Sequence, residues 1–502
     1  MVSAPVSAST VPDLLIAGCD VLPGPGEERR AVDVEIGGGR ISSIVDAGSA
    51  GDGSAERIDG TGLLAIPGLV NAHTHSPENC LRGIGEGLAL EPWLLRMFGS
   101  SGPYTPQDHY DCALAGAVEM LELGVTGVVD HLWMTPPSVE AVDAAMRAYR
   151  DIGIRATVAP LMDDHDYTED FGAAIGADLG IGGMSHHVAL PPAEELVAQL
   201  RESLASWHGA EGDRLRILAG PGGVQWASEE LLAGLAAAAR EHGAGIHIHL
   251  LETTLQDRVC RHRFGCSAVE ALDRLGILAP DCSLPHSVWT SDGDVELIAA
   301  SGAIPVHNPA ANLRLGSGRA PIRALLEAGA VVALGTDGSA SSDNQNLWEA
   351  LRLASLIHND AAAGRWLTSS ATLAMATSGG AAVIGRNAEL GRLAVGAIAD
   401  LALIDRRGDG VAGSVDTTAA LALSESGRGV RHVIVDGRPV VRDGRCVTVD
   451  RDAARARLAE QAARRSPTAS RPPDKTRRAM EEMMRFRGTA ARLTDNEERE
   501  TT

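Results

Sequence analysis

The stretch Pro67-Gly68-Leu69-Val70-Asn71-Ala72-His73-Thr74-His75 is a short apolar run that ends in two histidines separated by one residue. Side chains at positions i and i+2 of an extended strand point to the same side, so His73 and His75 can reach one metal ion from a single strand end. Such a pair alone is weak evidence, because neighbouring histidines are more often packed or surface residues than ligands. The stretch therefore predicts half of a metal site, which other parts of the chain must complete.

Two later apolar runs end in the same way. Ile246-His247-Ile248-His249-Leu250-Leu251-Glu252 carries a second pair of histidines, and Leu334-Gly335-Thr336-Asp337-Gly338 ends in a carboxylate. Histidine nitrogens and carboxylate oxygens are ligands that Zn²⁺ and similar ions accept. Three strand ends that carry such side chains make a shared metal site a stronger interpretation than chance.

Strand-like runs alternate with segments of helical period through the middle of the chain. This alternation is typical of repeated βα units around a parallel sheet. Eight strands in about 270 residues fit an α/β fold of the (β/α)8 TIM-barrel type, in which functional side chains gather at the C-terminal strand ends. The predicted strands cover 69–75, 125–132, 155–162, 215–221, 245–252, 283–288, 303–309 and 331–338. His73, His75, His249, His286 and Asp337 all fall at such ends.

The motifs and their order resemble the amidohydrolase superfamily, in particular its branch of cytosine-, guanine- and adenosine-type deaminases and s-triazine hydrolases. The resemblance extends over roughly residues 12 to 450. It rests on 67–75, 249–252, Leu284-Pro285-His286-Ser287, His307-Asn308-Pro309-Ala310-Ala311-Asn312 and 335–339.

Both ends of the chain are rich in short strand-like runs separated by Gly, Pro, Asp and Glu turns, from 13 to 66 and again from 399 to 448. We expect one small sheet domain built from both ends, and the resemblance implies a β-sandwich. The predicted domains are a composite β-sandwich of 1–66 and 396–450, a metal-dependent hydrolase barrel of 67–395, and a tail of 451–502 that is helical and then disordered and charged.

Composition narrows the class of protein. The 502 residues carry 44 basic and 66 acidic side chains, a net charge of −22, which argues against binding to nucleic acid. The seven cysteines are scattered and contain no Cys-x-x-Cys pair, which favours reduced thiols in a cytoplasm. No apolar stretch is long enough for a membrane span or a signal peptide. We therefore expect a soluble cytoplasmic protein that acts on a small molecule.

The proposed metal ligands are His73, His75, His249 and Asp337, which could hold one divalent ion, Zn²⁺ first and Fe²⁺ as an alternative, and leave a position for water. In the resembling deaminases the ligand lies three residues before the catalytic Glu, which here selects His249. His247 is then expected behind the ligands or packed in the core. Related barrels with two metals carry a carboxylated Lys after a middle strand, and 215–221 contains none, so we expect a single metal.

Three residues are candidates for catalysis. Asp337 can ligate the metal and also act as general base toward the attacking water. Glu252 is expected to protonate a ring nitrogen of the substrate and then to pass a proton to the leaving group. His286 would polarise the attacking hydroxide or stabilise developing charge.

Candidates for substrate binding are Glu91, Trp93, His131 and Gln225. Leu90-Glu91-Pro92-Trp93-Leu94 resembles the Glu-x-Trp-Leu of adenosine-type deaminases, and Asp130-His131-Leu132-Trp133 is similar to a segment of triazine hydrolases and oxopurine deaminases. Simple packing of Trp93 and Trp133 is an equal alternative. Nucleoside deaminases have Gly-Pro-His-x-Pro where this chain has Gly220-Pro221-Gly222-Gly223-Val224-Gln225-Trp226, which favours a free purine-, pterin- or triazine-like ring over a nucleoside.

These features together predict a metal-dependent hydrolase that deaminates an aromatic nitrogen heterocycle. A chlorohydrolase or a hydrolase of cyclic amides or imidazolones on the same site is the enzymatic alternative. An inactive barrel that serves as a binding protein is the alternative from another class. The resemblance also implies a homo-oligomer.

Overall fold

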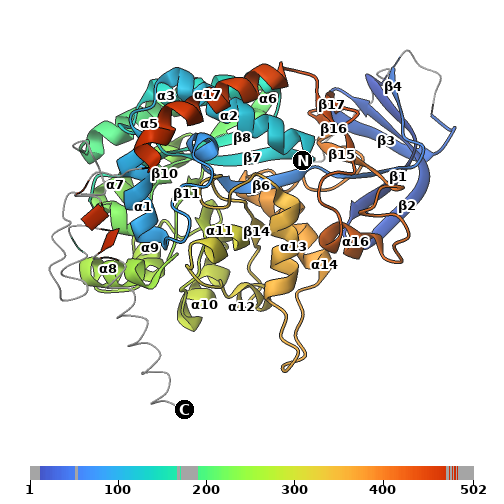
Figure 1. Cartoon of the computed structure of the whole chain (residues 1–502). Helices are drawn as coiled ribbons and strands as arrows, with labels where there is room; N and C mark the ends of the chain where they lie inside the picture. Colours follow the sequence, from blue (N-terminus) through green and yellow to red (C-terminus); the bar gives the residue numbers. More distant parts are fainter. Residues whose placement is uncertain are drawn as a thin grey trace.

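The two ends of the chain meet in one nine-stranded sheet (Figure 1). The computed structural model describes residues 12–50, 55–166, 170 and 190–470, and six positions between 474 and 483. The sheet order is β18-β17-β16-β15-β5-β1-β2-β3, with β4 paired to β1. Its strands are β1 (Leu14–Gly24), β2 (Glu27–Gly37), β3 (Arg40–Asp46), β4 (Glu56–Asp59), β5 (Leu63–Pro67), β15 (Leu401–Asp405), β16 (Val430–Val435), β17 (Arg438–Arg442) and β18 (Arg445–Cys446).

Antiparallel pairing of β5 with β15, from Leu401 opposite Pro67 to Asp405 opposite Leu63, joins the N-terminal to the C-terminal strands. The expected sheet domain from both chain ends is therefore confirmed. Since β6 follows β5 after one residue, this sheet also fixes where the first barrel strand begins.

The middle of the chain forms a closed barrel of parallel strands. One arc contains β6 (Leu69–Thr74), β7 (Val125–Leu132), β8 (Arg155–Met162), β9 (Leu215–Ile217) and β10 (Gly220–Pro221), and the other contains β11 (Ile246–His247), β12 (Cys282–Pro285), β13 (Ile304–His307) and β14 (Ala333–Leu334). Ala219 bridges to Ile246 on one side. On the other side the Asp337 amide donates to the His73 carbonyl at 2.9 Å. The predicted (β/α)8 barrel is confirmed.

Several barrel strands are shorter than the apolar runs that predicted them. The run 331–338 contains only the two-residue strand β14, and beyond it the Thr336 amide donates to Asn71 Oδ1 at 3.0 Å. Leu251, His286 and Asp337 adopt positive φ angles of 45°, 73° and 68°. A positive φ angle costs an L-residue about 1–2 kcal/mol. At each of these three residues it ends the pairing of extended strands, next to the candidate site residues.

Helices cover the outside of the barrel and pack against its strands. The apolar core between the two layers includes Val128, Tyr149, Ile217, Leu235 and Leu351. The α-helices of the barrel region are α1 (Leu90–Ser101), α2 (Pro106–Glu122), α3 (Val139–Ile152), α5 (Ala193–Trp207), α6 (Ala210–Asp213), α7 (Glu229–Glu241), α8 (Thr254–Phe264), α9 (Ala268–Arg274), α10 (Asp292–Ser301), α11 (Pro309–Arg314), α12 (Ile322–Glu327), α13 (Leu347–Ile357), α14 (Ser369–Ala374) and α15 (Gly380–Val383). Short helical turns are η1 (Ser76–Cys80), η2 (Val224–Trp226) and η3 (Met375–Gly379), and α16 (Thr417–Leu423) lies between β15 and β16.

The C-terminal helix α17 (Arg451–Ser470) lies against α2 and α1 (Figure 1). Its arginines form ion pairs with α2, from Arg457 to Asp111 at 2.7 Å and from Arg464 to Asp108 at 2.8 Å. Further along, Met483 is buried in the same apolar cluster as α1. The predicted helical part of the tail is thus a docked element. Most residues after 470 lie outside the described part of the chain. None of the described helices has both the length and the apolar character to cross a membrane.

Candidate metal centre and active site

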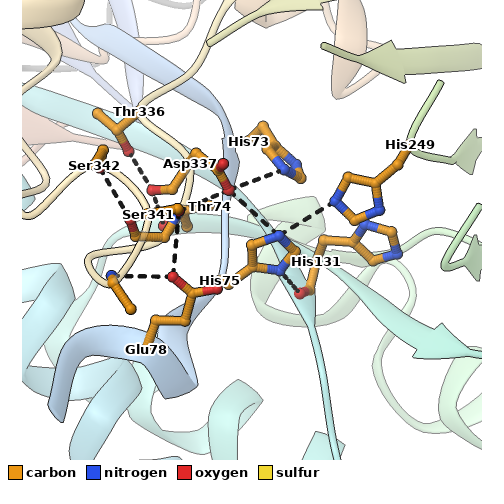
Figure 2. Close-up of polar contacts among 12 residues, drawn as sticks. His73, Thr74, His75, Glu78, His131, His249, Thr336, Asp337, Ser341 and Ser342 are labelled. Carbon is orange, nitrogen blue, oxygen red and sulfur yellow. Dashed lines mark hydrogen bonds and ion pairs between the residues drawn. The ribbon is translucent and has the colours of Figure 1, made fainter. Parts of the chain in front are cut away.

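Three histidines and one aspartate converge at the C-terminal end of the barrel (Figure 2). Asp337 Oδ1 lies 3.4 Å from Nε2 of His73 and 3.4 Å from Nε2 of His75. His249 Nε2 lies 3.3 Å from His75 Nε2. Ligands bound at about 2.0–2.1 Å around a tetrahedral ion are roughly 3.3–3.4 Å apart. The spacing of His73, His75 and Asp337 therefore fits neighbouring ligands of one ion of that size, and the distance from His249 to His75 fits as well.

The nitrogen that each of these histidines turns to the centre is free to bind a metal. His75 Nδ1–H donates to the His131 carbonyl at 2.6 Å, and His249 Nδ1–H donates to the Gly222 carbonyl. A carbonyl can only accept, so both protons are on Nδ1 and both Nε2 atoms keep their lone pairs. Buried His73 Nε2 has no hydrogen-bond partner among the described residues. This orphaned atom is what a metal site without its ion should contain.

His247 fixes the tautomer of His73 through a contact with its Nδ1 atom, on the side of the ring away from Asp337. Ser283 Oγ donates to the Ile246 carbonyl at 3.1 Å, so it accepts from His247 Nδ1–H at 2.7 Å. His247 Nε2 is then an acceptor, and it lies 2.8 Å from His73 Nδ1. The proton of His73 is therefore on Nδ1. His247 supports a candidate ligand, which is one of the two roles that its sequence left open.

Burial keeps the histidine rings of this cluster neutral. Desolvation lowers the pKa of His73, His131 and His249 well below the ordinary value, with a smaller contribution from neighbouring histidines. It lowers the pKa of His247 to about 3. Neutral imidazole is the form that binds metals, so the cluster is prepared for an ion before one arrives.

Glu252 and His286 lie next to this centre. Glu252 Oε1 is 3.7 Å from His286 Nδ1 and accepts from Ser317 Oγ at 3.1 Å. Desolvation by burial raises the pKa of Glu252 to about 7, although His286 and Ser317 act in the opposite direction. His286 Nδ1 lies 2.9 Å from Asn312 Oδ1, an acceptor, and so carries the proton. A carboxyl group that holds a proton near neutral pH is suited to general acid catalysis.

Glu78 is a further buried carboxyl group at the centre, and it was not among the predicted site residues. It follows His75 by one helical turn in η1 and accepts from the Ala340 amide at 3.0 Å and from Ser341 Oγ at 3.3 Å (Figure 2). Burial raises its pKa to about 7. Its acidic side chain in a turn that opens with Ser76-Pro77 was the available signal, because a charged residue is seldom buried without a role.

A cavity opens beside the candidate ligands, and its wall is mostly apolar. Three tryptophans, Trp93, Trp133 and Trp226, contribute to it, and carboxyl groups of Glu78, Asp163 and Glu252 face it. The other lining residues are His75, Leu90, Leu94, Met97, Phe98, Leu161, His249, His286, Leu315, Asp337 and Ser341. Flat aromatic walls with few polar groups suit a heterocyclic ligand.

The predicted substrate-binding residues divide into two groups. Trp93 lines the cavity. Glu91, His131 and Gln225 are buried outside its lining, where Glu91 accepts from Thr253 Oγ1 and His131 Nε2–H donates to the Gly220 carbonyl at 3.2 Å. Asp163 and Asn312, by contrast, were not predicted. The position of Asp163 directly after a strand was a signal. Asn312 ends one of the segments that carried the family resemblance, and its contact with His286 gives it a place in the site.

Comparison with known proteins gives consistent matches along most of the chain. The model of the Amidohydrolase family matches residues 64–440. A 5′-deoxyadenosine deaminase of Methanosarcina mazei is 32% identical over 444 residues, which cover 87% of this chain and 95% of the relative. A 5-methylthioadenosine/S-adenosylhomocysteine deaminase of Desulforudis audaxviator is 33% identical over 456 residues, with coverages of 90% and 98%.

Solved structures also match. The atrazine chlorohydrolase TrzN from Arthrobacter aurescens TC1, complexed with zinc, superimposes with a TM-score of 0.81 and 29% identity. The match covers 89% of this chain and 100% of that one.

Proposed function

Because the chain belongs to the amidohydrolase family, we propose that it is a metal-dependent aminohydrolase, which replaces an amino group on a nitrogen heterocycle by water and releases ammonia. The observation that most supports this proposal is the convergence of unprotonated nitrogens of His73, His75 and His249 near Asp337, next to the buried carboxyl group of Glu252, whose pKa burial raises to about 7. The proposed ion is zinc, which the donor set fits.

In the proposed reaction, Asp337, Glu252 and His286 have separate roles. A bound divalent ion supplies a water of lowered pKa as the nucleophile. Asp337 accepts a proton from the attacking water. Glu252 gives its proton to a ring nitrogen, which makes the neighbouring carbon more electrophilic. After the water oxygen has bonded to that carbon, Glu252 takes the remaining proton of this oxygen and passes it to the amine, which departs as ammonia. The proton held by Asp337 then restores the acid form of Glu252. His286 Nδ1–H is held by Asn312, so His286 Nε2 is left to accept from the attacking water.

The names of the relatives support a nucleoside as the substrate, in place of the free ring that the sequence favoured. Both curated deaminases above are named for derivatives of adenosine, whereas the sequence favoured a free purine-, pterin- or triazine-like ring. The apolar residues Leu90, Met97 and Phe98 along the cavity suit an uncharged substituent better than a phosphate. We therefore propose an adenine nucleoside with an uncharged 5′ end as the substrate class.

Ammonia release by the zinc-loaded protein tests this function. The panel contains 5′-deoxyadenosine, 5′-methylthioadenosine, adenosine, free adenine and an aminotriazine, each with Glu252→Gln as the control. Ammonia from the nucleosides, absent with the variant, is the expected result. Ammonia from adenine or the triazine alone would show that the substrate is a free ring and not a nucleoside. No ammonia from any compound would reject the proposal that the protein deaminates aminoheterocycles.

Displacement of chloride is the second candidate function. The structural match to TrzN and the segment Asp130-His131-Leu132-Trp133 favour it. Chloride release from atrazine, measured beside the ammonia assay, separates the two reactions. The same ion and the same acid would serve both, so only the leaving group distinguishes them.

A further inference from the structure

Asp163 lies at the boundary between two cavities. It follows β8 directly, is 5% exposed and faces the cavity beside the candidate metal centre. A smaller neighbouring recess is lined by Met134, Thr135, Pro137, Leu190 and Pro191. The cavity and the recess share four lining residues, which are Phe98, Trp133, Leu161 and Asp163. A ligand that extends from the centre toward the recess must therefore pass Asp163.

The carboxyl group of Asp163 occupies space that a glycine leaves open. A Cβ atom at Gly222 would lie 2.3 Å from Asp163 Oδ1, a distance that no side chain tolerates. The Gly222 amide donates to Oδ1 at 3.1 Å, which holds the carboxyl group in place. Gly222 is also the residue whose carbonyl orients His249. The position of Asp163 is therefore tied, through one residue, to a candidate metal ligand.

One oxygen of this carboxyl group is left for a ligand. Within the described part of the chain, Oδ2 of Asp163 has no hydrogen-bond partner, and it is not among the fully enclosed unpartnered atoms. Burial raises the pKa of Asp163 well above its usual range. A hydroxyl group can both donate and accept, so it can pair with the carboxyl group in either protonation state.

The residues that line the two cavities disfavour a substituent with a negative charge. Neither cavity has a lysine or an arginine among its described lining residues, and Glu78, Asp163 and Glu252 are all acidic. A phosphate or carboxylate would have to be desolvated next to these groups without a compensating cation, which is costly. Apolar groups, by contrast, fit the walls of the recess.

We propose that Asp163 is a specificity-determining residue that accepts a hydrogen bond from a hydroxyl group on the substituent of the heterocycle, and that the uncharged end of this substituent enters the recess of Met134, Pro137 and Leu190. This inference rests on the proposed function. It adds that the substituent on the heterocycle must carry a hydroxyl group. Substrates are then hydroxylated, uncharged derivatives of an aminoheterocycle.

A matched pair of substrates tests this role. The zinc-loaded protein is assayed with 9-(2-hydroxyethyl)adenine and 9-ethyladenine, which differ in one hydroxyl group. Asp163→Ala should lower the ratio of kcat/KM for the hydroxylated over the plain substrate on the order of ten-fold. Asp163→Asn, which keeps an acceptor for Gly222 and polar atoms toward the cavity, should retain part of the ratio. Asp164→Asn is the neighbouring control, since Asp164 instead accepts from Ser228 at 2.7 Å and does not line the cavity.

The outcomes separate this inference from the proposed function. An equal loss on both substrates, or an unchanged ratio in Asp163→Ala, would overturn the role of Asp163 while deamination stands. If the wild-type protein turns over neither compound, their binding is measured by quenching of the three cavity tryptophans. A selective loss of affinity for the hydroxylated compound in Asp163→Ala supports the inference, and an equal affinity for both refutes it. If the alanine variant fails to fold, the nearly isosteric Asp163→Asn should still lower the ratio, by less than the ten-fold expected for alanine, and an unchanged ratio in it refutes the inference.

Discussion

Each histidine that faces the candidate metal centre has a fixed partner on its other nitrogen. Two of the partners are backbone carbonyls, of His131 and Gly222, so no side chain supplies the acceptor there. His73 instead depends on the side chain of His247. Of these three partners, only that of His73 can be removed by truncating a side chain.

Replacement of His247 by alanine should weaken zinc binding by about 10- to 100-fold, because His73 loses the acceptor that keeps its proton on Nδ1. Competition with a chromogenic chelator measures the affinity. His358→Ala is the matched control, since His358 is also buried and contacts another histidine, His307, at 3.0 Å, but is outside the centre. Equal zinc affinity in the wild type and the His247 variant would contradict the inferred tautomer.

Glu252→Gln should reduce turnover by at least about 100-fold and leave zinc content unchanged, because glutamine cannot supply a proton. In the wild type, the pKa of Glu252 is raised to about 7, so the protonated form is present below that pH and is lost above it. Activity that depends on this proton should accordingly fall as pH rises through 7. A rate that keeps increasing up to pH 9 would assign the acid to another group.

The candidate ligands could be found from sequence because each one ends an apolar run. The strand period gives the side-chain direction of His73 in β6, whereas His249 and Asp337 lie just beyond β11 and β14, so only their places after apolar runs could be predicted. Glu78, Asp163 and Asn312 could not be found in the same way. Their places depend on turns such as η1 and on a glycine at 222, which bring together residues that are far apart in the sequence.

At the level of elements, the barrel and the sheet from both ends follow from patterns of apolar residues, whereas the strand limits do not. The run 245–252 predicted one long strand, but β11 contains only Ile246–His247. The following backbone turns away at Leu251, whose φ is 45°. A local apolar pattern cannot reveal such a turn, because the contacts that compensate its strain come from other strands.

The docking of α17 depends on one arginine more than on its neighbour. Arg465 is 7% exposed, pairs with Asp108 at 3.3 Å and lies 3.9 Å above the ring of Tyr104. Arg465→Ala should lower the free energy of unfolding by roughly 2–4 kcal/mol. Arg464→Ala should cost less than about 1 kcal/mol, because Arg464 pairs with the same aspartate while its side chain is 57% exposed.

Urea unfolding of the two variants measures the difference. The comparison is controlled internally, since both substitutions remove one cation from the same helix and the same acidic partner. If the two variants lose equal stability, the helix is held by general charge attraction and the contact with Tyr104 contributes nothing.

At the level of the whole molecule, buried ionisable groups should make the metal-free protein sensitive to acid. Among the described residues, seven buried histidines have a lowered pKa: His73, His109, His131, His247, His249, His307 and His358. Four buried carboxyl groups in the same part of the chain have a raised pKa: Glu78, Asp130, Asp163 and Glu252. As the pH falls, the histidines take up protons more readily in the unfolded chain, whereas the carboxyl groups take up protons more readily in the folded chain.

The histidines are more numerous than the carboxyl groups, so the stability of the metal-free protein should fall as the pH falls below the ordinary pKa of histidine. The urea midpoint of the metal-free protein should therefore fall clearly between pH 7.5 and 5.5. A midpoint that stays constant or rises over this range would show that the carboxyl groups outweigh the histidines. Added zinc should raise the midpoint at pH 7.5 and have little effect at pH 5.5, where protons compete for the same nitrogens.

Other properties of the whole molecule stay predictions from sequence. The cytoplasmic location rests on the seven cysteines, all of them free thiols in the structure. The homo-oligomer follows from the resemblance alone, and its mass in solution is a direct measurement by light scattering.

The contact that closes the barrel also bears on the order of events while the protein is synthesised. His73 and Asp337 meet across the seam between β6 and β14, and both are candidate ligands. A ribosome releases His73 and His75 early and Asp337 only after all eight barrel strands have emerged. Until then the nascent chain offers an ion two or three ligands without a completed cage. We therefore expect metal loading to be a late step of maturation, so that zinc-starved cells accumulate full-length chains without the ion.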